Sequence, residues 1–281
     1  MPIIAMSQEM ATLGKDVALG LCDALGLAQV RHEVGDVVAG KMHVKKSLIR
    51  RIREGKASRI EKWAADEKTI SIFTAEEVFD QAMKGNVLIR GWGATMLLHP
   101  VAHAACIRVC APMDLRIKRL MERLETDDED LARSEIEGDD AARAARIAEH
   151  FGLKWGDPTL YDLTLNTDRI SASTCVDLVV DLVKSEPFLE TPASRQRLAN
   201  LALRAHARAA LKANDATADV EVAIDADNGT IILNGIVLDE RERTLCEEVM
   251  ARTPGVHAVR NRLKTMAGGL SRFPSQLTSG D

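Results

Sequence analysis

Residues 2–25 read PIIAMSQEMATLGKDVALGLCDAL, and this stretch decides the fold of the amino-terminal part of the chain. Pro2 to Met6 is a short apolar run that predicts a β-strand. From Lys15 to Leu25, apolar side chains recur at the four-residue spacing of an amphipathic helix. A strand that leads through a short loop directly into a helix is typical of α/β proteins, so we expect that class here.

Short apolar runs and longer amphipathic segments continue to alternate as far as residue 184. Because strands that alternate with helices form mainly parallel sheets, the pattern predicts an α/β domain with helices on both faces of a mainly parallel sheet. The further predicted strands are 86–89 (NVLI), 106–110 (CIRVC) and 161–165 (YDLTL), and the further helices lie near 114–124, 128–151 and 172–184.

Residues 185–194 (SEPFLETPAS) mark a change in composition, with two prolines among small and polar residues. Segments of this kind separate domains. We therefore place one domain at 1–186 and a second at 194–266, and we expect the remaining residues, 267–281, to be disordered.

The second domain has a pattern of its own. A helix is predicted over 194–213, and residues 218–239 then alternate apolar and polar side chains with the period of β-strands. The DNG sequence at 227–229 is a hairpin turn signal, because these residue types tolerate a positive φ. Asp239 is a suitable N-cap for a following helix, and 256–263 gives a last strand. Helix, hairpin, helix and strand make a small α+β module.

The composition limits the class of protein. The chain has 281 residues, 37 Lys and Arg against 42 Asp and Glu, a formal net charge of −5 and only 3% aromatic residues. Proteins that coat nucleic acid are basic and use aromatic rings to stack on bases, so we expect no nucleic-acid partner. The start of the chain has no basic and apolar leader, and no run of eighteen apolar residues occurs. We therefore expect a cytoplasmic protein without a membrane span.

The cysteines and histidines give only a weak metal signal. Five cysteines, an odd number, are scattered through the chain, which indicates reduced thiols rather than a disulfide framework. His99 and His103 are four residues apart with Cys106 close by, a spacing that a metal site can use. No second pair of ligand-type residues accompanies them, so surface histidines are the preferred interpretation.

The loop between the first strand and the first helix carries the main chemical signal. A strand, a tight loop, a Gly-Lys pair and a helix place backbone N–H groups and an ammonium around a phosphate, and the helix N-terminus adds positive potential. Glu9, however, stands where a full phosphate loop has its first glycine, and Asp16 stands where Ser or Thr normally binds magnesium. An ordinary turn with a helix-capping Asp16 is the alternative interpretation. The candidate phosphate-binding residues are Thr12, Leu13, Gly14, Lys15 and Asp16.

Four segments of the first domain together resemble the cytidylate kinase-like family, relatives of the nucleoside monophosphate kinases with a diverged phosphate loop. The resemblance implies a P-loop kinase fold, ATP and a nucleoside monophosphate as ligands, and a lid whose arginines close over the phosphates. The segments are 2–27, 85–94 (GNVLIRGWGA), 111–124 (APMDLRIKRLMERL) and 138–167 (GDDAARAARIAEHFGLKWGDPTLYDLTLNT).

Asp140, Arg143 and Arg146 match the lid segment of that family. Arg143 and Arg146 are three residues apart, so they share a helix face and can both reach one anionic ligand. Pairing of these arginines with Asp139, Asp140 or Glu149 on a solvated helix is the alternative.

Two other basic groups have a simpler interpretation. Arg116 and Arg119 follow the third strand, where the resemblance places basic residues near the phosphates, but their spacing suits a solvent-facing helix and we prefer that interpretation. In a kinase of this family the segment 45–62 would help to hold the acceptor nucleotide. A solvated basic helix or a docking face for an acidic partner fits it equally well. Its basic residues are Lys45, Lys46, Arg50, Arg51, Arg53, Lys56, Arg59 and Lys62.

Residues 194–266 resemble a BON domain, above all in NGTIILNGIV and the closing GVHAVRNRL. Gly229 and Gly235 fit the turn and strand-end glycines of that family. The resemblance implies attachment to a membrane, a lipid or a protein. Because no signal peptide is visible, a cytoplasmic interaction module for a protein or a small ligand is the expectation here.

These observations give two hypotheses. The first is an ATP-dependent phosphotransferase that acts on a pyrimidine nucleoside monophosphate such as CMP and carries a regulatory BON module. Lys15 would neutralise the β and γ oxygens of the donor, Arg143 and Arg146 would stabilise the transferred group, and Asp16 would bind Mg²⁺. The second is a catalytically silent nucleotide-binding adaptor or sensor whose output is binding through the BON domain.

Overall fold

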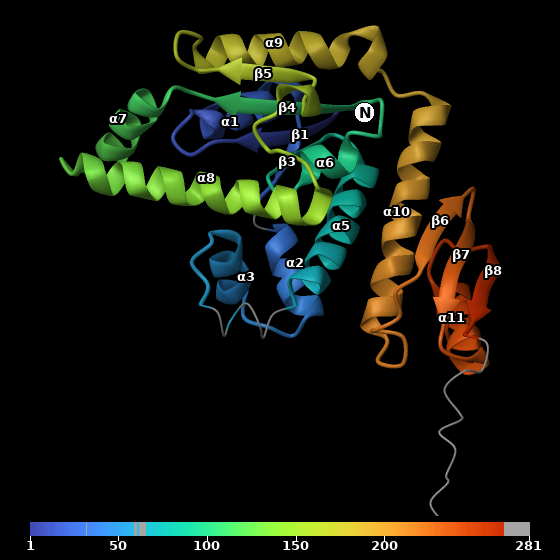
Figure 1. Ribbon diagram of the computed structural model, residues 1–281. Coiled ribbons are helices and arrows are strands. Elements are labelled where there is room, and N and C mark those ends of the chain that lie inside the picture. Colours follow the sequence, from blue (N-terminus) through green and yellow to red (C-terminus); the bar gives the residue numbers. More distant parts are fainter. Residues whose placement is uncertain (32, 59–60, 62–65, 267–281) are drawn as a thin grey trace, which may run out of the picture. The chain divides into compact units, whose positions relative to one another are not determined.

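A computed structural model describes residues 1–31, 33–58, 61 and 66–266 (Figure 1). The chain divides into two compact units, Met1–Ala205 and His206–Asp281, and each unit is described on its own. The expectation of disorder for 267–281 concerns residues outside the described part of the chain.

The first unit is built on one five-stranded sheet. Its strand order is β2-β3-β1-β4-β5, and all four neighbouring pairs are parallel, which confirms the prediction of an α/β fold on a mainly parallel sheet. The strand β2 was not predicted, because three residues are too few to show a period. The strands are β1 (Ile3–Gln8), β2 (Ala28–Val30), β3 (Val87–Arg90), β4 (Ala104–Cys110) and β5 (Leu163–Asn166).

Helices cover both faces of this sheet, which is why its central strands are apolar on both sides. On one face, α1 (Gly14–Leu25) and α9 (Ala172–Lys184) pack together over the strands in the main apolar core, and Figure 1 shows α9 above the sheet and α8 below it. The remaining helices are α2 (Glu33–Lys41), α3 (Lys46–Arg53), α5 (Glu67–Lys84), α6 (Ala94–Leu98), α7 (Met113–Leu124) and α8 (Glu129–Phe151), with short 3₁₀ turns at Pro158–Leu160 and Glu186–Phe188.

Local chemistry fixes where these helices begin and end. The Asp128 side chain caps α8 by accepting from the Leu131 N–H, and Ser171 caps α9 in the same way. Gly26 ends α1 in the left-handed region (φ 64°), where its N–H donates to the Cys22 carbonyl. The acidic run at 125–130 lies at the connection between α7 and α8 and is mostly exposed, as the sequence indicates.

The second unit contains a three-stranded sheet of order β6-β7-β8. The β6–β7 hairpin is antiparallel and β7–β8 is parallel. Asn228 and Gly229 form the hairpin turn with positive φ (46° and 79°), and Asp239 caps α11 by accepting from the Glu242 N–H. Helix, hairpin, helix and strand follow one another as predicted. The elements are α10 (Pro192–Ala213), which crosses the division between the units, β6 (Ala223–Asp227), β7 (Thr230–Val237), α11 (Glu240–Arg252) and β8 (Ala258–Thr265).

The prediction of surface histidines is wrong for His103. Its side chain is buried in the turn before β4, where burial lowers its pKa, whereas His99 is exposed. Within the described ranges, no group of three or more His, Cys, Asp or Glu side chains is placed to hold a metal ion, and all five cysteines are free thiols. None of the described helices has the length and apolar character to cross a membrane.

Candidate active site

The loop Glu9–Leu13 joins β1 to α1 in an unusual backbone conformation. Ala11 (φ 61°) and Leu13 (φ 59°) are both left-handed although neither is glycine, which costs on the order of 1 kcal/mol or more for each residue. Gly14 follows at the start of the helix, where an added Cβ would lie 2.5 Å from the Gln8 Oε1 atom. Only glycine fits at this point, so the close approach of backbone to side chain fixes the path of the loop.

Lys15 and Asp16 lie on the first turn of α1, and both are exposed. Neither forms an ion pair with another described residue. The ammonium of Lys15 and the amino-terminal end of a twelve-residue helix fit the phosphates of a nucleotide, because both present positive charge to the same anion. The exposed carboxylate of Asp16 fits a hard cation such as Mg²⁺.

Glu9 does not oppose a phosphate, because its charge is already neutralised. Its Oε1 atom accepts from Arg108 Nη2 at 2.6 Å, and its Oε2 atom lies 3.5 Å from Arg116 Nη1 and accepts from the Ala111 N–H at 3.4 Å. The side chains of Arg108 and Arg116 are buried, with exposed fractions of 7% and 4%. The carboxylate at the first loop position is thus part of a buried ion cluster and not a free negative charge.

Arg116 extends this cluster to α8. Its two terminal nitrogens donate to the two carboxylate oxygens of Asp140 at 2.8 Å each, and its Nε donates to the Met10 carbonyl. We call Glu9, Arg108, Arg116 and Asp140 the loop network. It joins the loop after β1 to β4, α7 and α8, and its two positive charges match two negative ones.

The solvent-facing interpretation of Arg116 is therefore wrong, and Arg119 also points inward. Arg119 donates to the Thr167 hydroxyl and carbonyl, and the Thr167 hydroxyl in turn donates to the Thr12 carbonyl. Thr12 itself is buried and donates its hydroxyl to the Glu9 carbonyl. The side chain of Thr12 thus shapes the loop from inside.

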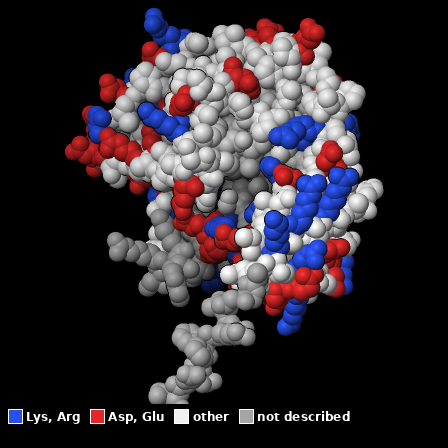
Figure 2. All heavy atoms as spheres, turned by 45° about the vertical axis from the view of Figure 1, so that its right-hand side comes forward, with Lys and Arg blue, Asp and Glu red and all other residues white. Residues whose placement is uncertain are grey.

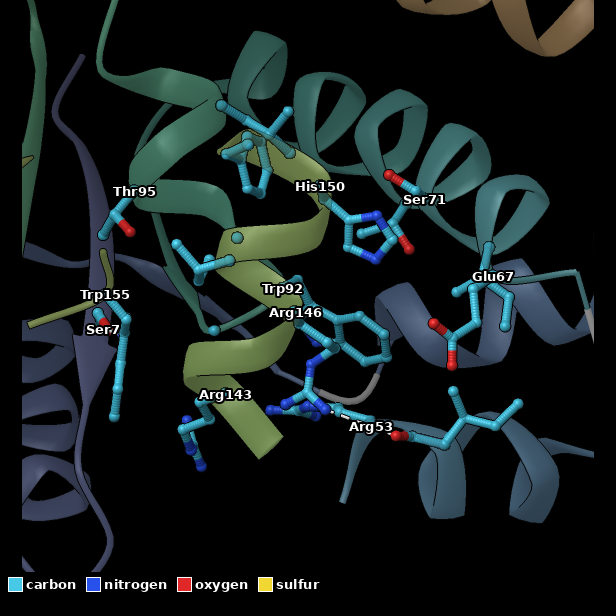
Figure 3. Close-up of a pocket in the computed structure, with 18 of the residues that line it drawn as sticks. Ser7, Arg53, Glu67, Ser71, Trp92, Thr95, Arg143, Arg146, His150 and Trp155 are labelled. Atoms are coloured by element: carbon cyan, nitrogen blue, oxygen red, sulfur yellow. Dashed lines mark hydrogen bonds between the residues drawn. The ribbon is translucent and has the colours of Figure 1, made fainter. Parts of the chain in front are cut away.

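A pocket opens beside this loop, where β1 and β3 end. Its walls come from β1, α3, α5, the β3–α6 connection and α8. Arg143 and Arg146 line it from α8, and Arg53 lines it from α3 (Figure 3). Lys15 and Asp16 are not among the lining residues. The structure therefore places Arg53, Arg143 and Arg146 around one cavity, whereas Lys15 lies outside it, on the first turn of α1.

The arginines of this pocket carry more positive charge than the nearby carboxylates balance. Burial, and after it the charges of neighbouring arginines, lowers the pKa of Arg53 to about 10 and the pKa of Arg90 to about 10. The same causes lower the pKa of Arg146. Arg143 is paired with Asp139 at 2.6 Å, as the alternative interpretation of α8 proposed. Arg53, Arg143 and Arg146 line the cavity, and Arg90 is a close neighbour whose charge acts on Arg53 but which is not among the lining residues. We call these four residues the pocket arginines; clustered guanidinium groups of this kind favour a doubly charged anion.

Two hydrogen-bonding observations support an anion at the pocket arginines. The Nη1 atom of Arg90 is buried and has no hydrogen-bond partner in the described part of the chain. Among the described residues, the one hydrogen-bond acceptor that Arg146 reaches is the Ile52 carbonyl, at 3.5 Å. Buried guanidinium donors without acceptors are costly, so a ligand with several acceptor oxygens would lower their free energy.

Aromatic rings form the other walls of the pocket. The Arg53 guanidinium lies 4.5 Å from the ring centre of Trp92, and the Trp92 Nε1–H donates to the Arg31 carbonyl. Trp155 donates to the Ser7 hydroxyl at the end of β1, and its ring lies 4.3 Å from the Arg108 guanidinium. Fixed aromatic faces beside a cationic cluster suit a ligand that has both a planar ring and a phosphate.

Several of these residues were not singled out from the sequence. Arg108 lies inside the apolar run CIRVC, and Arg90 directly follows NVLI. A charged residue within or at the end of a buried strand was the available signal. Three basic residues of the segment 45–62 form ion pairs: Lys46 with Asp36, Arg51 with Glu61, and Lys56 with Glu135. Of the described basic residues in this segment, Arg53 lines the pocket. Arg59 and Lys62 lie outside the described residues.

Comparisons with known proteins agree with this architecture. The family model described as cytidylate kinase-like family matches residues 3–169, and the BON domain model matches residues 200–267. A cytidylate kinase of Staphylothermus marinus is 28% identical over 127 residues, which cover 45% of this chain and 70% of that protein. A cytidylate kinase of Halobacterium salinarum is 36% identical over 73 residues, covering 26% of this chain and 38% of that protein.

A solved structure supports the fold alone. An uncharacterised protein from Eubacterium ventriosum superposes with a TM-score of 0.52 at 20% identity, over 66% of this chain and 100% of that chain. The first family model covers more than half of the sequence. The chain belongs to the cytidylate kinase-like family and carries a carboxyl-terminal BON domain.

Proposed function

We propose that the first unit is an ATP-dependent phosphotransferase whose acceptor is a pyrimidine nucleoside monophosphate such as CMP. The observation that carries the proposal is the pocket beside the loop after β1, where Arg53, Arg143 and Arg146 line a cavity with aromatic walls. The neighbouring Arg90 keeps a buried donor without an acceptor in the described part of the chain. The pocket arginines would bind the acceptor phosphate, and Trp92 or Trp155 would contact the base. The curated relatives are described as cytidylate kinases, which favours a cytosine nucleotide.

The donor would bind at the loop and the first turn of α1. Lys15 and the loop N–H groups would hold its phosphates, and Asp16 would hold Mg²⁺, which when bound neutralises phosphate charge. Arg143 and Arg146 would stabilise charge on the transferred group, because they line the acceptor pocket from α8. An acceptor phosphate is itself a nucleophile, so the site needs positioning and charge neutralisation more than a general base.

A coupled assay with ATP, Mg²⁺ and a panel of nucleoside monophosphates tests this proposal. We expect ADP formation with at least one pyrimidine monophosphate and a loss of about 100-fold or more in kcat for Lys15→Ala. Lys118→Ala is the matched control, since Lys118 is an exposed lysine on α7 outside the loop and the arginine pocket. Absence of turnover with every acceptor would contradict the proposal.

A silent nucleotide-binding adaptor is the second candidate, and the loop itself favours it. Asp16 presents a carboxylate where a phosphate loop normally presents a hydroxyl. This candidate predicts tight ATP or CMP binding by calorimetry without ADP formation. In that case binding through the BON module would be the output, and nucleotide would change the affinity of that module for its protein or small-ligand partner.

A further inference from the structure

The outer face of the β6-β7-β8 sheet carries side chains of three kinds in three parallel rows. On the inner face, Ile224, Leu233 and Leu263 are buried. Asn261 on β8 also points inward, because its amide donates to the Arg243 carbonyl and the Glu247 carboxylate on α11. Since successive residues of a strand alternate between faces, the neighbours of these residues lie on the outer face.

The middle row, on β7, carries exposed apolar side chains, together with Thr230 and Asn234. Ile236 is 66% exposed and Leu238, just after the strand, is 68% exposed. No other large apolar side chain in the described part of the chain is as exposed as these two. Ile232 lies on the same face, in register with Asp225 and Arg260. An exposed apolar row on a regular sheet marks an interaction surface.

The outer rows carry opposite charges. Asp225 stands on β6, and Arg260, Arg262 and Lys264 follow one another on the outer face of β8; all four are exposed. None of these four side chains forms an ion pair within the described residues. The two rows are separated by the full width of β7, about 10 Å, and no ion pair joins them within the described residues. Figure 2 shows several Lys and Arg side chains gathered on the surface that faces the viewer.

We propose that this face binds the same face of a second copy of this chain. If the two-fold axis runs parallel to β7, the apolar rows of the two copies meet at the centre. Rotation about that axis exchanges the outer rows, so β8 of each copy lies over β6 of the other. Because Asp225 and Arg260 share one cross-strand level with Ile232, Arg260 of each copy faces Asp225 of its partner. The pattern is self-complementary, as a two-fold interface requires.

The charge pattern distinguishes a second copy from other occupants. An anionic membrane or a polyanion would match the basic row and be repelled by the acidic one, whereas in the dimer Asp225 of each copy faces Arg260 of the other. A three-stranded face of about 20 Å in length is small, below the usual interface of about 800 Å² per partner. The dimer is therefore a weak one that forms at high protein concentration.

The test is sedimentation velocity of the full chain from about 5 to 500 µM, a range suited to weak interfaces. The wild-type sedimentation coefficient rises with concentration toward that of a dimer. Asp225→Arg and Arg260→Asp each weaken self-association by roughly tenfold or more, because each puts like charges face to face twice per dimer. An equimolar mixture of the two variants restores the association, since residues 225 and 260 of one variant then face opposite charges on the other.

Two further variants separate this result from a folding defect. Ile236→Lys removes the central apolar contact and weakens self-association. Mixing Ile236→Lys with either charge variant does not restore the association. Arg241→Asp, a charge reversal at an exposed position on α11 away from this face, leaves association unchanged. Thermal unfolding of each variant reports whether the unit still folds.

Three results would overturn the proposal. They are a wild-type chain that stays monomeric over the whole concentration range, a mixture that associates no better than its components, and a monomer that uses this face to bind vesicles of anionic phospholipid.

Discussion

Two groups of arginines lie close together in the first unit and do opposite things. In the loop network, Arg108 and Arg116 are matched by Glu9 and Asp140 through short contacts, so the group is neutral without any ligand. The pocket arginines have Asp139 as their close carboxylate partner, and Arg90 keeps a buried donor without an acceptor. Burial of an arginine therefore does not by itself mark a binding site. The balance of charge around it decides between holding the fold and holding an anion.

The largest expected effect is a loss of stability when the loop network is broken. Arg116→Met removes the partner of Asp140 and one neighbour of Glu9. Asp140, which is partly buried, then has no charge partner, and Glu9 keeps Arg108 alone. We expect the free energy of unfolding to fall by about 3 kcal/mol, as measured by urea denaturation. In the double variant Arg116→Met with Asp140→Leu, much of this loss is recovered, because no unpaired charge remains at that end. A single variant as stable as the wild type would show that the loop network does not stabilise the fold.

A smaller effect, on ligand affinity and not on stability, is expected from a change among the pocket arginines. Arg53→Met keeps an apolar stem against Trp92 but removes a charge that neighbouring arginines repel. We expect unchanged or slightly higher stability, and a rise of about 10- to 100-fold in the KM or Kd for the acceptor. Inorganic phosphate supplies a readout that does not need turnover: it raises the Tm of the wild type and raises that of Arg53→Met less. Equal stabilisation of both proteins by phosphate would place the anion elsewhere.

The smallest effect is expected at an ion pair in solvent. Lys46→Ala breaks a 2.6 Å contact with Asp36, in which both side chains are about half exposed or more. Water screens such a pair, so the free energy of unfolding changes by about 0.5 kcal/mol or less. The measurement is the same urea denaturation used for Arg116→Met. A loss as large as that of Arg116→Met would mean that burial does not separate the two kinds of pair.

The elements that the sequence predicts well are those whose signal is local. The β1–loop–α1 stretch, the hairpin turn at Asn228-Gly229 and the Asp239 cap all depend on residues within a few positions of one another, and the structure confirms them. The preference for a solvent-facing Arg116 failed because its partners are 24 and 107 positions away, at Asp140 and Glu9. No periodicity within α7 contains that information.

In the candidate site, too, residues that local spacing predicts can be separated from residues that depend on distant contacts. The arginine pair on α8 follows from helical spacing, and both members line the pocket. The contribution of Arg53 depends on how α3 meets α8, where an added Cβ at Gly55 would touch Ala142, and a linear pattern does not encode that contact. The role of Arg108 could not be predicted from the sequence. A charged residue in an apolar strand can be assigned a partner only when the fold shows that Glu9 lies beside it.

The position of β1 at the centre of the sheet has a consequence for how the chain folds. Its Ile3 pairs with Val87 on one side and with Ala104 on the other, so the first strand to be synthesised meets its partners only after about a hundred further residues. Contacts so distant in sequence slow folding, because the chain must close long loops before the contacts form. Glu9 meets Arg108 across 99 positions and therefore finds its counter-charge only once β4 has docked. Until then the strand and the acidic loop remain unpaired, and a nascent or refolding chain is most exposed to misassembly at the segment that later holds the site.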